Sequence, residues 1–498
     1  MKMVKSLLLG SAAGLVAVAG AQAADLPVKA KPVEYVKVCS LYGAGFWYVP
    51  GTDTCLKVGS YVRVQTEWGA NGGGIPIGMG AATGRNTRTD TNDLAFRTRS
   101  ALSIDLRTQT EYGTLRSYLE VGAQQSTPND ATEAVFFDRG FIQFAGFTAG
   151  RIRSYFDINS MAPYSYANSR VSGDTGASGI YGIAYTAQFG NGVTASLSFE
   201  DGGASAAGAT AGGGRGHLEV NLSMPSQFAL GATTYDNKGF TYPDVVGALR
   251  IDQAWGYAQV AAALHDASAG YYQTGTSTLA TGIEANGHPG EKHGFAVTGG
   301  FTLNDVLGMK GDQFGMQAAY AQGAAGYVTR ATGAFQYYGS GHSAGFGWVS
   351  DGTFVTGGAV ELTTVWGING FFQHFWNPKW RTSLYGGYVN VDYGGTATTS
   401  ICGAAGVGGV VAAPSGVAMT AVSNCNPDFS WWQVGSRTQW NPHPDLDIGL
   451  DVLYTKLNTA FGGTAVLAGN GARTGGIYAI EDQDVISVLF RIQRNFLP

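Results

Sequence analysis

The feature that most constrains the fold of this chain is a series of candidate β-strands whose connections alternate between short and long. A tilted strand of about 9–11 residues crosses a bilayer. The sixteen candidates are 56–68, 94–109, 113–125, 135–144, 147–154, 179–189, 193–200, 244–253, 257–265, 294–303, 313–323, 360–376, 380–393, 428–440, 446–458 and 484–496. Membrane barrels have short periplasmic turns and long external loops, whereas a soluble sandwich has no reason to alternate in this way. The sequence therefore predicts an all-β, 16-stranded antiparallel transmembrane β-barrel.

Within the candidates, apolar and polar residues alternate with a period of two. In 94–109, apolar residues fall mainly on even positions, and Arg97, Arg99 and Arg107 fall on odd positions. The segments 446–455 and 485–496 repeat the pattern. Successive side chains of a strand point to opposite faces of its sheet, so each strand has one face for lipid and one for water.

The even number of strands places both chain ends on the periplasmic side. The segments 217–222 and 227–235 could add two strands, giving eighteen, but we interpret them as part of a long external loop.

Composition agrees with a barrel and disfavours other classes. Charged residues make up 13% of the chain, against roughly 25% in average domains. The mean hydropathy of −0.01 is too low for a helical membrane protein. The net charge of −5 argues against nucleic acid as a partner, because nucleic-acid binding needs a basic face.

The N-terminus reads as an export signal. Lys2 and Lys5 precede the apolar stretch 7–19, and residues 21–23 (AQA) form a small-residue cleavage site. A lone N-terminal membrane helix is the alternative, but the stretch is short. We expect a signal peptide at 1–23, a periplasmic segment at 24–55 and the barrel at 56–498.

Four cysteines in an exported chain predict two disulfides. They are Cys39, Cys55, Cys402 and Cys425. The apolar stretch 401–422 resembles a membrane helix, but it is rich in glycine and lies between two of the cysteines. We interpret it as a surface loop tied by a Cys402–Cys425 bond.

The predicted lumen face is cationic, and a barrel of sixteen strands leaves an aqueous channel. Its basic residues are Lys57, Arg63, Arg97, Arg99, Arg107, Arg116, Arg381, Arg437 and Arg491. We expect several of them to form an arginine ladder, because neighbouring strands lie about 4.8 Å apart. Alternatively, each arginine pairs with Glu67, Asp105 or Glu120 and stiffens the wall.

The connection 155–178 is the candidate for a loop that folds inward and narrows the channel. It carries Asp157, Asp174 and Arg170. If it folds inward, its acids would face the arginine wall, and a transverse field would act on passing solutes. The alternative is an outward surface loop. The predicted constriction therefore comprises Arg63, Arg97, Arg99, Arg107, Arg116, Asp157 and Asp174.

The sequence gives little sign of catalytic or metal chemistry. His288 and His293 flank Glu291, but a solvated loop explains them better than a metal site. His342 and Ser343 could suggest a hydrolase, but we interpret them as part of a loop, and the glycine-rich stretches lack the features of a phosphate-binding loop. We expect no enzyme activity, no cofactor and no metal.

Several stretches resemble the alphaproteobacterial porin family, the group of the Brucella and Bradyrhizobium porins. The most specific is 45–59 (GFWYVPGTDTCLKVG); others are 24–29, 34–39, 243–246, 252–256 and 493–496. The resemblance implies a homotrimeric, sixteen-stranded, water-filled porin with an inward third loop and a Cys39–Cys55 disulfide. The chain departs from the family pattern in an apparent insertion at 216–240 and in Leu497-Pro498 after the last aromatic residue.

The favoured function is a passive outer-membrane channel for small hydrophilic solutes and ions. Its expected surroundings are outer-membrane lipid, lipopolysaccharide and two further copies of the chain. The alternatives are a channel that prefers one substrate, and an adhesin or receptor that acts through long loops such as 201–243 and 394–427.

Overall fold

The protein is described here from a computed structural model of the chain. The structure describes residues 37–69, 94–127, 134–167, 179–202, 215–223, 236–239, 241–272, 282–329, 333–338, 342–403, 417–467 and 475–496. The expected signal peptide and Asp174 lie outside these residues.

The main sheet has 17 strands, of which the two-residue β1 (Trp47–Tyr48) only flanks β2, so that 17 − 1 = 16 strands form the ring. The ring strands are β2 (Thr54–Trp68), β3 (Leu94–Thr110), β4 (Gly113–Ser126), β5 (Ala134–Phe144), β6 (Phe147–Ile152), β7 (Ile180–Gly190), β8 (Val193–Glu200), β10 (Asp244–Gln253), β11 (Gly256–Asp266), β12 (His293–Asn304), β13 (Gln313–Gln322), β18 (Thr364–Asn377), β19 (Trp380–Asp392), β21 (Phe429–His443), β22 (Leu446–Asn458) and β25 (Gln483–Phe496).

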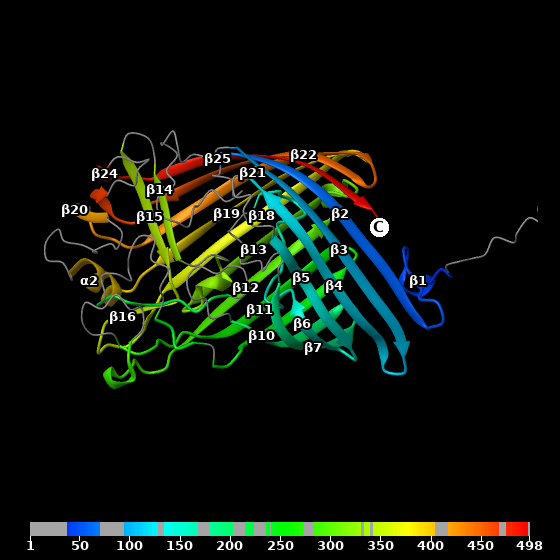
Figure 1. Ribbon diagram of the computed structural model, residues 1–498, viewed down its shortest axis with the longest axis horizontal. Helices are drawn as coiled ribbons and strands as arrows, with labels where there is room; N and C mark the ends of the chain where they lie inside the picture. The colour runs from blue at the N-terminus through cyan, green and yellow to red at the C-terminus, as the bar shows by residue number, and fades with distance from the viewer. Residues whose placement is uncertain are drawn as a thin grey trace, which may run out of the picture.

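Each ring strand pairs antiparallel with its neighbours, and the pairing of β2 with β25 closes the barrel (Figure 1). The register of this closing pair runs from Ser60–Phe496 to Trp68–Val488. Closure leaves no strand edge without a partner, which lipid could not satisfy. The predicted sixteen-stranded antiparallel barrel is confirmed.

The period-two pattern becomes the two faces of the wall. On β3, the side chains of Phe96 and Leu102 are exposed outward, while Asp105 on the opposite face is buried. On β25, Ile486 and Phe490 are exposed outward, while Ser487 is fully buried. The apolar outer face meets lipid, and the polar face lines the inside.

Tight turns join the strands at one end of the barrel. The Ala145-Gly146 and Asn191-Gly192 turns have positive φ angles at both residues, 49° and 85° in the first and 50° and 73° in the second. Positive φ at both positions is the geometry that two-residue hairpins of a twisted sheet favour, and glycine supplies it without steric cost.

The aromatic residues beside the short turns lie at one level of the outer wall. Trp380 and Trp440 are stacked, with ring centroids 5.8 Å apart, and both are part-exposed. Trp255 and Trp376 are exposed beside their own turns. Tryptophan favours the headgroup level of a membrane, so these residues mark an interface with it.

The long connections at the opposite end form structure of their own. Their elements are β9 (Glu219–Asn221), β14 (Gly333–Tyr338), β15 (Ser343–Val349), β16 (Gly352–Phe354), β17 (Glu361–Leu362), β20 (Val417–Asn424), β23 (Gly462–Leu467), β24 (Gly476–Ile480), the helix α2 (Gly395–Gly403) and the 3-10 turns η3 (Glu284–Asn286) and η5 (Ala325–Tyr327). A further turn, η4 (Val306–Gly308), lies between β12 and β13. The strands of the long connections form a five-stranded and a three-stranded sheet. Both sheets lie at the end of the barrel away from β1 in Figure 1.

The ambiguous segment 217–222 does not add to the barrel. Its strand β9 pairs in parallel with β16 of another long connection, outside the ring. The second ambiguous segment, 227–235, lies outside the described residues.

Both predicted disulfides are present. Cys39 and Cys55 have Cα atoms 6.0 Å apart and join the 3-10 turn η1 (Ser40–Tyr42) region to β2. Cys402 and Cys425 have Cα atoms 5.8 Å apart. The stretch between the latter pair begins in α2 rather than in irregular loop. Within the described residues, no helix is long and apolar enough to span a membrane.

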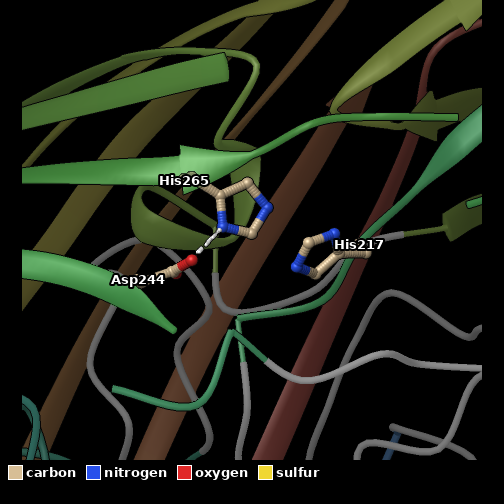
Figure 2. A group of neighbouring side chains, drawn as sticks. All are labelled: His217, Asp244 and His265. Carbon is tan, nitrogen blue, oxygen red and sulfur yellow. Dashed lines mark hydrogen bonds and ion pairs between the residues drawn. The ribbon is translucent and has the colours of Figure 1, made fainter. Parts of the chain in front are cut away.

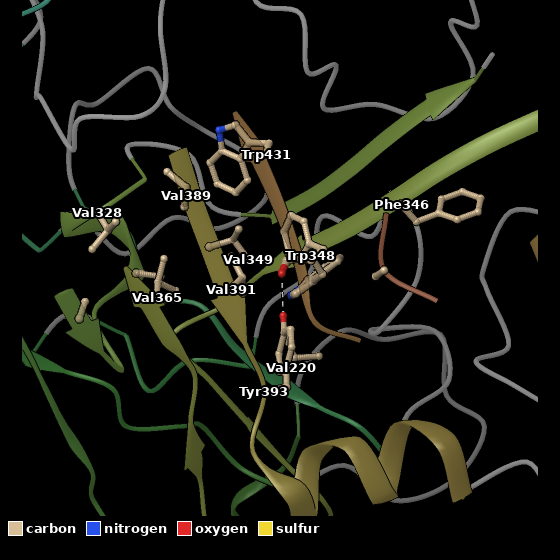
Figure 3. Close-up of a cluster of buried hydrophobic side chains, with 14 of the residues drawn as sticks. Val220, Val328, Phe346, Trp348, Val349, Val365, Val389, Val391, Tyr393 and Trp431 are labelled. Carbon is tan, nitrogen blue, oxygen red and sulfur yellow. Dashed lines mark hydrogen bonds between the residues drawn. The ribbon is translucent and has the colours of Figure 1, made fainter. Parts of the chain in front are cut away.

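An apolar core fills part of the barrel mouth at the long-loop end. Trp348 and Val349 of β15 pack with Val389 and Val391 of β19 and with Trp431 of β21 (Figure 3). Tyr393 donates a hydrogen bond of 2.7 Å to the carbonyl of Trp348. Parts of the long connections therefore lie inside the barrel mouth and cover the inner face of several strand ends.

Candidate pore constriction

A cluster of arginines lies on the lumen face of the closing strands. Arg63 on β2 and Arg99 on β3 are direct partners across the sheet. Arg63 donates to Gln493 at 2.7 Å, and both Arg97 and Arg491 donate to Gln65 at 3.1 Å. Strand pairing alone brings these four arginines together, as the ladder hypothesis requires.

Acidic and phenolic groups hold the cluster in place. Arg99 forms an ion pair with Asp138 of β5 and donates to the Tyr61 hydroxyl at 3.0 Å. Glu67 accepts from Gln65 at 3.0 Å. Asp138 was not singled out from the sequence; a bulge between β4 and β5 shifts the register there, so its face could not be read from alternation alone.

Arg107 and Arg116 form a separate group near the short turns. Both bind Asp105, with nitrogen–oxygen distances of 2.8 and 3.0 Å. Arg107 also stacks on Phe46 of the disulfide-tied N-terminal segment, 4.9 Å from the ring centre. It is eight residues from Arg99, or about 26 Å along a strand. The predicted ladder is therefore two groups at different depths.

The remaining basic residues divide between the two sides of the lumen. Lys57 lies with the group of Arg107, over the ring of Phe46 at 5.9 Å. Arg381 on β19 stacks on Phe375 at 5.6 Å. Arg437 on β21 donates to Gln373 and Ser383, both at 3.3 Å.

The inward segment, defined here as residues 153–167, follows β6 and runs inside the barrel. It begins where Ser154 and the amide of Tyr155 donate to Glu200 at 2.6 and 2.9 Å. Asn159 then contacts three strands. Its side-chain oxygen accepts hydrogen bonds from Tyr257 of β11 at 3.0 Å and from Thr302 of β12 at 2.9 Å. Its backbone amide donates a hydrogen bond to Gln317 of β13 at 3.2 Å.

The far end of the inward segment is fixed by one buried carboxylate. Asp451 of β22 accepts hydrogen bonds from the amides of Tyr166 and Ala167 at 2.6 and 3.2 Å, from the Ser165 hydroxyl at 3.1 Å and from Tyr385 at 2.7 Å. We call this group the Asp451 latch.

The ring of Tyr166 lies between two arginines of the wall. The guanidinium carbons of Arg491 and Arg437 are 4.0 and 5.0 Å from its centre. Among the described residues, the segment thus contacts the inner face from β8 to β22 and does not cover that of β2 to β4, where the side chains of Arg99 and Arg116 keep 15% and 27% exposure.

Asp157 lies on the inward segment but does not face the arginine cluster. Its carboxylate is fully buried and forms ion pairs with Arg215 at 2.6 Å and Arg153 at 3.7 Å. Burial lowers the pKa of Arg215, but the charges of Asp157, Tyr327 and Glu200 outweigh burial and leave that pKa raised. The charge of Asp157 is therefore balanced locally.

These features define a class: a closed antiparallel membrane barrel with an apolar outer wall and a charged lumen narrowed by an inward segment. The sequence comparison agrees. The family described as "Porin subfamily" matches residues 25–489, and the chain belongs to that family. Its barrel lies in the outer membrane.

The relatives carry the same description. The chain is 34% identical over 267 residues to the "Porin Omp2b" of Brucella abortus (strain 2308), covering 51% of this chain and 63% of that protein. It is 35% identical over 263 residues to the Porin Omp2b of Brucella suis, covering 64% of it. The chain thus aligns with less than two thirds of these relatives.

A solved structure has the same fold. The outer membrane channel DcaP of Acinetobacter baumannii superimposes with a TM-score of 0.56, covering 90% of this chain and 99% of that chain at 14% identity. At this identity the similarity concerns the fold.

Proposed function

We propose that the chain forms a passive, water-filled pore through which small hydrophilic solutes and ions diffuse across the outer membrane. The observation that carries this proposal is the charged lumen face of β2 to β4, which the inward segment, as far as the structure describes it, does not cover. A barrel of sixteen strands is wide enough for an aqueous channel, and the inward segment narrows it without crossing the uncovered face.

The arginine cluster (Arg63, Arg97, Arg99 and Arg491) gives this pore an anion-attracting wall at its narrow part. Its partners, Glu67 and Asp138, are buried at 5% and 3% exposure and Arg491 at 8%, so Arg63, Arg97 and Arg99 present the accessible charge. Fixed charge at a constriction sets which ions concentrate there.

Liposome swelling tests the proposal. Vesicles that carry the refolded mature chain should admit small sugars at rates that fall with solute size and do not saturate with concentration. Empty vesicles and vesicles with heat-denatured protein serve as controls. Vesicles that stay sealed to small sugars while holding folded barrels would contradict it, and saturation by one solute would favour a substrate-preferring channel.

The proposal includes two expectations from the sequence: removal of residues 1–23 on export and assembly as a homotrimer. The mass of the purified mature protein and of its detergent-extracted complex measures both.

A further inference from the structure

A buried group of histidine and aspartate side chains lies away from the arginine cluster, at the long-loop end of the barrel. His217 comes from the long connection between β8 and β10, Asp244 is the first residue of β10, and His265 lies near the end of β11. All three side chains are shielded from solvent. Figure 2 shows the two imidazole rings turned toward one another with the carboxylate beside them.

The ligand atoms of this group are close together. One nitrogen of each histidine and one oxygen of Asp244 all lie within 4.8 Å of one another. The ring centres of the histidines are 4.5 Å apart. A tetrahedral zinc ion holds nitrogen ligands at about 2.0–2.1 Å, which places its ligands about 3.4 Å apart. A contraction of roughly 1 Å would bring these atoms to a metal.

A glycine packs closely against two of the ligands. A Cβ atom on Gly202 would lie 2.8 Å from Oδ1 of Asp244 and 3.1 Å from Nε2 of His217. A side chain at position 202 would therefore press on both ligand atoms at once.

The surroundings carry an excess of buried acceptors. Both carboxylate oxygens of Glu219 are buried without a hydrogen-bond partner among the described residues. Nε2 of His265 is 3.8 Å from Asp351, and its Nδ1 is 2.9 Å from Asp244. Buried acceptors and carboxylates are costly unless a donor or a cation balances them.

We propose that His217, Asp244 and His265 bind a divalent transition-metal ion of the zinc class. Two imidazoles and one carboxylate are ligands that suit Zn²⁺ and its neighbours, whereas Mg²⁺ and Ca²⁺ take oxygen ligands. The ion ties the connection between β8 and β10 to the ends of two barrel strands. The loop residues considered as metal ligands in the sequence do not belong to this site. His293 forms a hydrogen bond with Tyr242, and Glu291 forms an ion pair with Lys238.

Zinc binding by the refolded mature chain tests this inference. Protein stripped with a chelator is given ZnCl₂, desalted and analysed for zinc content, and the affinity is measured by competition with a zinc-binding dye. We expect one tightly held ion per chain. Co²⁺ in its place should give a visible absorption spectrum typical of nitrogen and oxygen ligands.

Three variants locate the ion. His217→Gln and His265→Gln each remove a ligand, and Gly202→Ala crowds Asp244 and His217 while keeping every ligand. Each should weaken zinc binding at least about 100-fold, because loss of a mere supporting residue already costs 10–100-fold. His443→Gln, which removes an exposed imidazole at a short turn, should bind as the unmodified chain does.

Folding of each variant is read from the mobility shift between unheated and boiled samples on electrophoresis. Gly202→Ala keeps the test valid if a histidine variant does not fold. If the unmodified chain retains no zinc, or if Gly202→Ala binds it undiminished, the inference is wrong. In the first case the group is a proton-holding polar network.

Discussion

At the scale of single residues, some arginines of the lumen have accessible charge, whereas several acidic residues are buried and form ion pairs with arginines. Arg63, Arg97 and Arg99 face the uncovered side, whereas Asp157 is sealed against Arg215. The position of Asp157 on an inward segment was predictable from the sequence. Its partner was not, because Arg215 is 58 residues away and comes from a different long connection.

Neutralising Arg63, Arg97 and Arg99 to glutamine should shift ion selectivity toward cations. The reversal potential across a planar bilayer in a salt gradient measures the change. The shift should be large near 0.1 M salt, where the Debye length is about 10 Å, and small near 1 M, where it is about 3 Å.

Arg107→Gln is the matched control for that experiment, because Arg107 is also paired with an aspartate but lies at another depth of the lumen. It should shift the potential less than Arg99→Gln. Equal shifts from both would remove the arginine cluster from the narrow part of the pore.

Substituting Asp451 by asparagine should loosen the inward segment. The variant replaces a charged acceptor of four hydrogen bonds with a neutral one, and a hydrogen bond to a charged group contributes about 1.5–3 kcal/mol. We expect noisier and larger single-channel currents with the barrel intact. As a control, Asp252→Asn, which alters an exposed ion pair, should leave the currents unchanged. If Asp451→Asn gave currents with the same size and noise as the unmodified chain, the role of the Asp451 latch would be refuted.

At the scale of elements, the ring strands were predictable and the loop strands were not. The segments 193–200, 244–253 and 446–458 match β8, β10 and β22 at both ends, because lipid on one face and water on the other impose a period of two. The strand β9 has three residues and pairs with β16, whose Gly352 is 133 residues after Glu219. Such short strands are too brief to show a period of two in the sequence. The two loop sheets and the apolar core at the barrel mouth were therefore not predictable and are known only from the structure.

The Cys402–Cys425 bond belongs to this scale, since it joins the α2 region to the end of β20. In the chain-entropy description, closing a loop of this size stabilises by about 3 kcal/mol. The Cys402→Ser/Cys425→Ser variant should therefore lose protease resistance in its long loops while its conductance is retained. Peptide mapping without reductant detects the bond directly; free thiols at both positions in folded protein would refute it.

At the scale of the whole molecule, the proposed function rests on the combination of a complete barrel wall and a segment that obstructs part of the lumen. The ring of strands alone would enclose a wide lumen. The inward segment and the apolar core at the barrel mouth narrow that lumen from one side. The sequence predicted the ring and an inward loop from the strand count and from the resemblance. Which wall remains uncovered depends on the Asn159 and Asp451 contacts, which join residues far apart in the chain.

The seam between β2 and β25 has a consequence for how this protein comes into existence. Arg63 of β2 bonds Gln493 of β25, 430 residues later, so one edge of the first ring strand stays unpaired until β25 is in place. Without β25, the other strands would form an open sheet with two unpaired edges, and lipid has no groups that could satisfy those edges. Insertion into the membrane therefore has to await the closing pair.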